Sequence, residues 1–229
     1  ENLLNRLEEN QKQLDICKKS LADFLDGRRR QFPRYYFTSE SDLLDILSNG
    51  STPEKILKHT SKIYLCTKTL EVDKTKRSPE DRPIAVEFIA GVGQENVEFE
   101  PAVPLEGKVE IYHQTVLDAM KLSIFKNLVR SIKRYTAMPR EKWLMHKKPD
   151  SESRRPGVDS SDPAQIILIS VAIFYVQEVE EVFAKLATGG SMSLMEDYKE
   201  KQVGQLKELI KLTQTKLDKS DRTRVMVCI

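Results

Sequence analysis

The chain has 229 residues, of which 39% are hydrophobic and 31% are charged, so it is long enough to bury one sizeable core or two small ones. Its 37 Lys and Arg residues nearly balance its 35 Asp and Glu residues, giving a formal net charge of +2. This balance gives no electrostatic reason to expect a surface for nucleic acids or membranes.

The cysteines and the apolar runs limit the protein class further. Cys17, Cys66 and Cys228 are far apart, odd in number and without CxxC spacing. They therefore predict neither a disulfide framework nor a zinc site, and we expect buried free thiols in a reducing compartment. The longest apolar run, residues 166–176, is too short to cross a bilayer, and no secretory signal opens the chain. We expect a cytosolic or cytoskeletal protein.

Both ends of the sequence resemble cut ends. The first residue is Glu1 instead of Met, and the leucines that follow it are already in helical rhythm. The last five residues, 225–229, are mostly apolar, whereas natural termini are usually polar and frayed. We expect a fragment of a longer protein.

The first predicted element is a long amphipathic helix. Apolar residues recur at three- and four-residue steps from Leu4 to Leu25, and Gly27 is the expected end of this helix. Pro33 then breaks the pattern, and the aromatic residues 35–37 predict an extended stretch.

Capping signals place the next helices. Ser39 followed by Asp42 resembles a capping box and predicts a helix over residues 40–48. The pair Asn49-Gly50 predicts a left-handed cap at its end, and Thr52-Pro53 predicts the start of another helix.

The hydrophobic period changes in the middle of the chain. Residues 63–72, 84–90 and 96–100 are β-branched or alternating, which predicts a small antiparallel sheet or hairpin. We expect Pro101 and Pro104 to end it.

The helical period returns after Gly107. One apolar face predicts a helix to about Tyr135, and Pro139 then predicts the start of a short helix that contains Trp143. Residues 147–162 are rich in Ser, Pro and charge and predict a loop.

Two long helices are predicted at the end. Residues 164–187 are apolar on nearly all sides at first, so we expect this helix to be central in the core. Residues 188–191 predict a turn, and residues 194–217 predict an amphipathic helix antiparallel to the one before.

These elements predict a mainly α fold, an elongated stack of antiparallel helical bundles with a small β-hairpin or sheet insertion. The expected division is an N-terminal helical part (1–62), the β insertion (63–106) and a C-terminal helical bundle (107–229).

The sequence predicts no catalytic, cofactor-binding or metal-binding residues. Gly91-Val92-Gly93 lacks the third glycine and the helix start that a dinucleotide site needs. His59, His113 and His146 lack metal-site spacing, so we interpret them as surface or helix-terminal histidines. The acidic pairs among residues 178–181 are interpreted as a solvated helix face, and no nucleophile elbow is present.

Cations and aromatic residues interleave at one place. Arg28, Arg29 and Arg30 precede Arg34, Tyr35 and Tyr36, a pattern that nucleic-acid binding can use through phosphate contacts and stacking. The alternative is a structural corner, in which the aromatic residues pack between helices and the arginines cap and form ion pairs. The near-neutral charge favours the structural corner.

The same region carries a family pattern. Residues 17–64, from Cys17 through the Phe32–Phe37 block to Tyr64, resemble the linker of dynein heavy chains in their Leu-x-x-[Tyr/Phe]-Leu, basic, Phe-Pro-Arg and Asp-Leu-Leu blocks. Residues 107–120, 139–144, 162–183, 198–210 and 221–229 are similar to later blocks of that linker, in the same order. This resemblance is to the C-terminal half of the linker, and to ciliary outer-arm chains more than to the cytoplasmic form.

The sequence departs from the family pattern at several positions. Tyr112 and His113 replace the usual Trp-Leu pair, residues 174–176 replace the common Trp-Thr ending, and residues 151–161 form a Ser- and Arg-rich insert. These departures indicate a divergent chain and leave its paralogue open.

The resemblance implies a mechanical, non-catalytic lever over the AAA+ ring of the same heavy chain, in a ciliary or flagellar axoneme. ATP and Mg would bind in that ring, beyond Ile229, and this segment would hold no cofactor. The implied partners are the ring, other dynein subunits and, through the parent motor, microtubules, with no nucleic acid and no membrane. Residues 73–82 and 94–100 are the expected ring contacts. The alternative is a non-catalytic helical scaffold or adaptor of a cytoskeletal complex.

Overall fold

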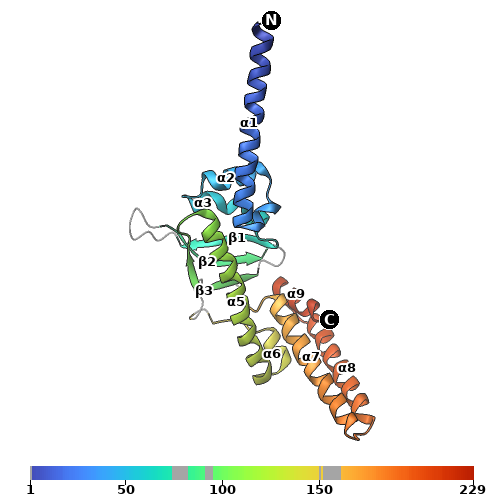
Figure 1. Ribbon diagram of the computed structural model, residues 1–229. Coiled ribbons are helices and arrows are strands. Elements are labelled where there is room, and N and C mark those ends of the chain that lie inside the picture. The colour runs from blue at the N-terminus through green and yellow to red at the C-terminus, as the bar shows by residue number, and fades with distance from the viewer. Residues whose placement is uncertain (1, 74–81, 91–94, 150, 152–160) are drawn as a thin grey trace. The chain divides into compact units, whose positions relative to one another are not determined.

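The computed structural model describes residues 2–73, 82–90, 95–149, 151 and 161–229 (Figure 1). These residues are mainly helical with a small antiparallel sheet of three strands, which confirms the predicted fold class. The chain forms two compact units, unit 1 (residues 1–91 and 101–119) and unit 2 (residues 92–100 and 120–229). The expected division at residues 62 and 106 stays a prediction.

The first helix, α1 (Asn2–Gln31), is longer than predicted. The expected end near Gly27 is wrong, because the helix continues through this glycine and its last turn carries Arg28, Arg29 and Arg30, which favour the negative end of the helix dipole. The extended stretch expected at residues 35–37 is also wrong. These residues form a 3-10 helix, η1 (Pro33–Phe37), for which Pro33 supplies a preset φ at the first position.

The helix α2 (Glu40–Ser48) has the predicted bounds. The amide of Asp42 donates to the Ser39 hydroxyl over 3.1 Å, and that hydroxyl donates to the Asp42 carboxylate over 2.7 Å. The left-handed cap expected at Asn49-Gly50 is wrong, since Asn49 has φ −102° and its side-chain amide donates instead to the carbonyl of Asp45.

Three short helices and a sheet follow in unit 1. The helix restart at Pro53 is confirmed by α3 (Pro53–Ile56), which continues into η2 (Leu57–His59) and α4 (Thr60–Ile63). The first strand, β1 (Thr67–Asp73), therefore begins later than the predicted residue 63.

Strand β1 pairs antiparallel with β2 (Ile84–Ala90), and β3 (Asn96–Pro104) completes the order β1-β2-β3. Pro101 does not end β3, which runs on to Pro104. Proline has no N–H to donate to a neighbouring strand. The edge strand β3 tolerates proline because one of its two sides has no neighbouring strand.

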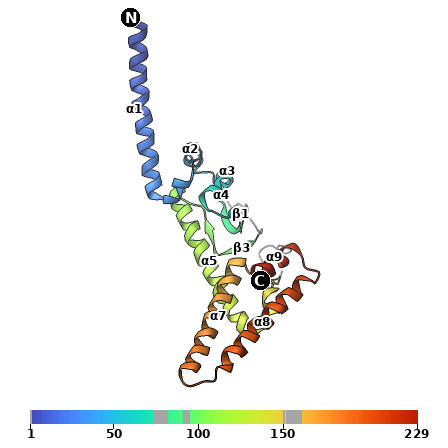
Figure 2. The ribbon, with the colours of Figure 1, turned by 90° about the vertical axis from the view of Figure 1, so that its right-hand side faces the viewer.

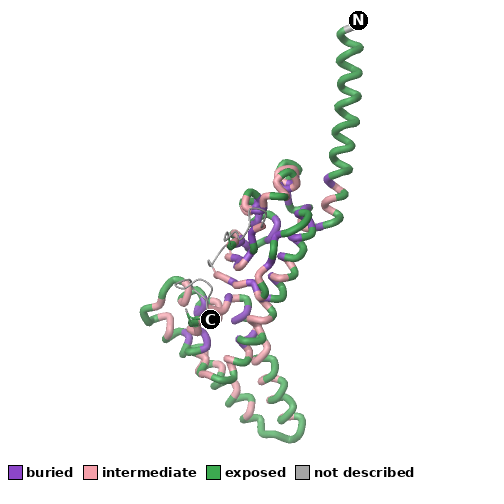
Figure 3. Tube along the Cα trace, turned by 90° about the vertical axis from the view of Figure 1, so that its left-hand side faces the viewer, coloured by how far each residue is buried: buried purple, intermediate pink, exposed green. Residues whose placement is uncertain are grey.

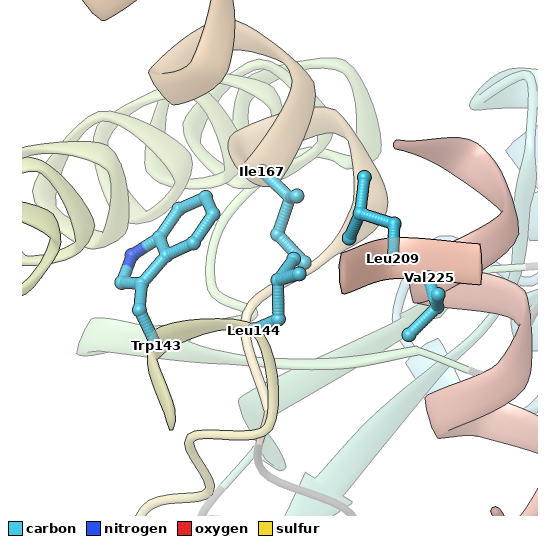
Figure 4. Close-up of a cluster of buried hydrophobic side chains, with 5 residues drawn as sticks. All are labelled: Trp143, Leu144, Ile167, Leu209 and Val225. Atoms are coloured by element: carbon cyan, nitrogen blue, oxygen red, sulfur yellow. The ribbon is translucent and has the colours of Figure 1, made fainter. Parts of the chain in front are cut away.

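The helices α5 (Val109–Ala137) and α6 (Arg140–Leu144) agree with the prediction. Trp143 is buried, and its indole donates to the Ser131 carbonyl over 3.1 Å. In unit 2 it is part of a core cluster with Leu144, Ile167, Leu209 and Val225 (Figure 4).

The last long helices form the predicted antiparallel pair, α7 (Ala164–Ala187) and α8 (Ser193–Thr213) (Figure 2). Gly189 takes φ +92° in the turn between them. Only the first turns of α7, with Ile166 and Ile167, are buried, and Phe183 is exposed. The expectation that α7 is central in the core is wrong for its second half.

One helix was missed by the sequence analysis. The chain forms α9 (Lys219–Val227), capped by Asp218, whose carboxylate accepts from the Asp221 amide over 2.7 Å. The Asp218-x-x-Asp221 spacing is the signal that could have found it.

The expectation of buried cysteines is wrong, since Cys228 is only partly buried. Cys17 and Cys66 are exposed, and all three thiols are free. Cys66 lies in the turn between α4 and β1, where the Thr67 amide donates to the Tyr64 carbonyl over 3.0 Å. Its φ is +65°, a conformation that strains any residue with a Cβ atom.

This strain predicts that Cys66→Gly stabilises the protein by about 1 kcal/mol, because glycine adopts a positive φ without the clash, although it gains entropy in the unfolded chain. The measurement is urea unfolding, with Cys17→Gly as the matched control. Cys17 lies inside α1, so glycine there is expected to lower stability. A lower unfolding midpoint for Cys66→Gly would contradict the prediction.

Candidate functional site

The arginine and aromatic run of the sequence leads to a buried contact region in unit 1. We call this region the His113 junction: it comprises Phe32, Tyr35, Tyr64, Tyr112 and His113, all of which are buried. The residues come from the segment after α1, from η1, from the end of α4 and from α5. The junction therefore joins elements that are distant in sequence.

Two hydrogen bonds hold the junction at His113. The Tyr35 hydroxyl lies 2.9 Å from Nδ1 of His113, and the Tyr64 hydroxyl donates to the His113 carbonyl over 2.8 Å. Phe32 packs edge-on against Tyr35 with ring centroids 4.9 Å apart, a favourable aromatic geometry. The polar atoms are thus paired inside an apolar surrounding.

Burial sets the protonation state of the junction. Loss of solvation lowers the pKa of His113 to about 3, so its imidazole is neutral at physiological pH. Burial also raises the pKa of the Tyr35 and Tyr64 hydroxyls, which stay protonated. The Tyr35–His113 pair is consequently an uncharged link.

An ion pair lies beside the junction. Arg28 in the last turn of α1 donates to Glu110 in the first turn of α5 over 2.6 Å. The Glu110 side chain is only 6% exposed and that of Arg28 is 27% exposed, so the pair is largely shielded from solvent. Arg34 donates to the Ile63 carbonyl over 3.3 Å and lies over the Tyr64 ring. These contacts agree with the structural-corner interpretation of the run.

A second polar cluster joins α2 to η2. Nε2 of His59 lies 2.7 Å from an oxygen of Asp45, and Nδ1 lies 3.5 Å from an oxygen of Asp42. Lys58 pairs with Asp45, and Lys62 with Asp42. The His59 hydrogen bond, followed by that of Lys58, lowers the pKa of Asp45 to about 2. His59 and His113 are both buried. His59 is a helix-terminal histidine at the end of η2, as one of the two expected placements has it, whereas His113 lies within α5 and fits neither a surface nor a helix-terminal position.

The expected ring contacts are only partly described. Residues 74–81 and 94 lie outside the described part of the chain, as do Gly91-Val92-Gly93 of the weak nucleotide motif. Within unit 2, Glu98 pairs with Lys148 at 2.6 Å and Glu100 pairs with Arg130 at 2.7 Å. The Glu95 carboxylate accepts from the Ala164 amide over 2.9 Å at the start of α7.

Metal sites and membrane spans can be judged for the described residues. Within these ranges no group of three or more His, Cys, Asp or Glu side chains is arranged to hold a metal ion. The helices that could be searched include none with the length and apolarity to span a membrane. The sequence did not predict the role of His113. The one signal was that Tyr112 and His113 replace the Trp-Leu pair that is usual in the family pattern.

The chain was compared with known proteins. Residues 1–131 match the family described as dynein heavy chain, N-terminal region 2. The chain belongs to the dynein heavy chain family. It is 38% identical over 99% of its length to the dynein alpha chain of the flagellar outer arm of Chlamydomonas reinhardtii, and 35% identical over 98% to the ciliary dynein beta chain of Tripneustes gratilla.

Human dynein axonemal heavy chain 17 is 34% identical over 98% of the chain. The chain spans about 5% of the length of each of these relatives. Their axonemal, ciliary and flagellar names support a location in the axonemal cytoskeleton of cilia and flagella.

The neutral His113 predicts a specific pH dependence of stability. The unfolded chain binds its proton near pH 6.5 and the folded chain only near pH 3, so this contribution is complete above pH 6.5 and is lost as the pH falls toward 3. The slope is about 1.4 kcal/mol per pH unit within that window. His113→Gln keeps a polar partner for Tyr35 but cannot titrate, so its urea unfolding should lose this slope. Parallel stability–pH curves for the two proteins would contradict the assignment.

Proposed function

We propose that this segment is part of the linker of a ciliary or flagellar dynein heavy chain, in its C-terminal half, and acts there as a mechanical lever. In this proposal the lever changes position over the AAA+ ring of the same chain as ATP is bound and hydrolysed, and so drives movement along microtubules. The segment itself is non-catalytic. ATP and Mg belong to the ring, and other dynein subunits join through the parent protein.

The observation that carries the proposal is the fastening of α1 to α5 in unit 1. The Arg28–Glu110 pair joins the end of α1 to the first turns of α5, and the Tyr35–His113 link joins η1, which follows α1, to the same turns. A lever transmits force only if its parts do not slide past one another. Close packing with buried, paired polar groups resists such sliding, because breaking one pair leaves a charge or a polar atom unsatisfied. The family membership supplies the motor context.

A scaffold or adaptor role is the second candidate. It needs the same stable fold but no coupling to ATP hydrolysis. The two functions therefore differ in what happens when the junction is loosened in an active motor, and not in the stability of the isolated segment.

The first test is Glu110→Ala in the full-length heavy chain. The change leaves Arg28 without its shielded partner and weakens the fastening by about 2 kcal/mol. We expect slower microtubule gliding while ATPase activity stays within about twofold, since the catalytic ring is untouched. The matched control is Asp26→Ala, which breaks the more exposed Arg30–Asp26 pair and should leave both activities nearly unchanged. Unchanged gliding for Glu110→Ala would favour the scaffold role.

The second test concerns the proposed ring contact of residues 73–82. Replacing Lys74, Lys76 and Arg77 by Glu reverses the basic charge of this stretch. A contact with the ring would be weakened by repulsion, so gliding velocity should fall and the coupling of ATPase activity to gliding should change. The control reverses three exposed lysines of α8, namely Lys199, Lys207 and Lys211. Equal behaviour of the two variants and the unaltered motor would remove this contact from the proposal.

A further inference from the structure

The loop between α2 and α3 contains the pair Asn49-Gly50. Asparagine is a chemically labile residue, most of all when glycine follows it. In its deamidation, the backbone nitrogen of the next residue attacks the side-chain amide carbon, and glycine has no Cβ to hinder that nitrogen. Asn49 and Gly50 are partly buried and Ser51 beside them is exposed, so water, the other reactant, reaches the loop (Figure 3).

The chemistry needs no reactant other than water. The Gly50 amide gives its proton to water, and its nitrogen forms a bond to Cγ of Asn49. The bond between Cγ and Nδ2 breaks, and Nδ2 leaves as ammonia after taking up a proton from the solvent. A water molecule then opens the cyclic imide at either of its carbonyls. The product is aspartate or isoaspartate, in which the main chain runs through the former side-chain carbon.

Hydrogen bonds hold the Asn49 side chain against this reaction. Its Nδ2 donates to the carbonyl of Asp45 and to Oδ1 of the Asp45 carboxylate, each over 2.9 Å. Oδ2 of Asp45 is fixed in turn by Nε2 of His59 and by Nζ of Lys58, each at 2.7 Å. We call the Asp45 carboxylate held in this way the Asp45 clamp. It keeps the Asn49 amide in one position.

The backbone of the loop is also turned away from ring closure. Asn49 has ψ 15°, which places the Gly50 nitrogen near the backbone nitrogen of Asn49 and far from its Cβ. Ring closure requires rotation of this peptide, which disturbs the contacts of Gly50 with α5. There the Gly50 carbonyl accepts from the Tyr112 hydroxyl over 3.3 Å, and a Cβ on Gly50 would lie 3.4 Å from that of Val109. The reaction must therefore wait for local opening of the loop.

We propose that Asn49 is a site of spontaneous deamidation and that the Asp45 clamp sets how fast this modification accumulates. Both products lose the amide donor and add a carboxylate near that of Asp45, and the two like charges repel. The isoaspartate product also lengthens the main chain where Gly50 lies against Val109. The modification thus loosens the loop from α5 over the life of the protein. Both the reaction and its restraint are independent of the lever function.

The test follows deamidation of Asn49 by mass spectrometry of its peptide, while the full-length heavy chain is kept at physiological pH and temperature. Asp45→Ala removes the clamp and should speed the reaction about tenfold, since a charged hydrogen bond that opposes opening is lost. Asp45→Asn keeps an acceptor oxygen and should stay within about threefold of the unaltered chain. Gly50→Ala places a Cβ beside the attacking nitrogen and should nearly stop the reaction. In urea, the unaltered chain should react at least about tenfold faster than when folded.

Two further variants separate the clamp from a general loosening of α2. Asp42→Ala is the matched control, because Asp42 belongs to the same cluster but pairs with Lys62, and it should change the rate by less than about twofold. Asp45→Ala also leaves His59 without its partner, so a second variant adds His59→Leu and should show the same acceleration. Native proteolysis within residues 40–63 shows whether each variant is folded.

Several results would overturn the proposal. One is that neither folded variant without the Asp45 carboxylate deamidates faster, and another is that Asp42→Ala is accelerated equally. Equal rates for the unaltered chain folded and in urea would show that the fold does not restrain Asn49. An unchanged rate in Gly50→Ala would exclude the cyclic imide, and an unmodified Asn49 in all chains would exclude the site.

Discussion

The loss of solvation at His113 is the constraint on which unit 1 depends. Placing an imidazole among Phe32, Tyr35 and Tyr64 removes its charge, and the neutral ring can then accept or donate one hydrogen bond to Tyr35 without an ion partner. The charged groups are kept a turn away, where Arg28 and Glu110 pair with each other in a position largely shielded from solvent. Neutral polar contacts thus occupy the centre of the junction and the ion pair occupies its rim.

This division has a mechanical consequence. Separating the partners of a buried ion pair costs several kcal/mol and breaking a neutral hydrogen bond costs less, so both contacts oppose separation of the helices and the ion pair opposes it more strongly. Both contacts lie between the same elements, α1 or η1 on one side and the start of α5 on the other. The second polar cluster, around His59, fastens α2 to η2 in the same way with Asp42 and Asp45. These two connections in unit 1 are therefore made by paired side chains in addition to apolar contact.

Local signals in the sequence predicted local structure well. The Ser39 capping box fixes the start of α2 because its hydrogen bonds span only three residues, and the start of α3 at Pro53 and the turn at residues 188–191 follow from equally local signals. The errors arose where distant packing overrides local preference. Glycine only weakens a helix by about 1 kcal/mol. The hydrogen bond from Arg28 to Glu110 of α5 stabilises the last turn of α1, which continues beyond Gly27. Neither the 78-residue separation of Tyr35 and His113 nor the burial of His59 can be read from spacing.

The apolar helix faces follow a related logic. The first turns of α7 are buried and its second half is exposed, and in α1 the change runs in the opposite direction, from the exposed residues 3–24 to the buried Leu25. In both helices the apolar period continues across the boundary, so the sequence alone gives no sign of where burial stops. A period of this kind is typical of a helix face that packs against another element. Among the described residues, the contacts within each unit account for the buried part of each stripe, and the exposed part continues the same pattern without such contacts.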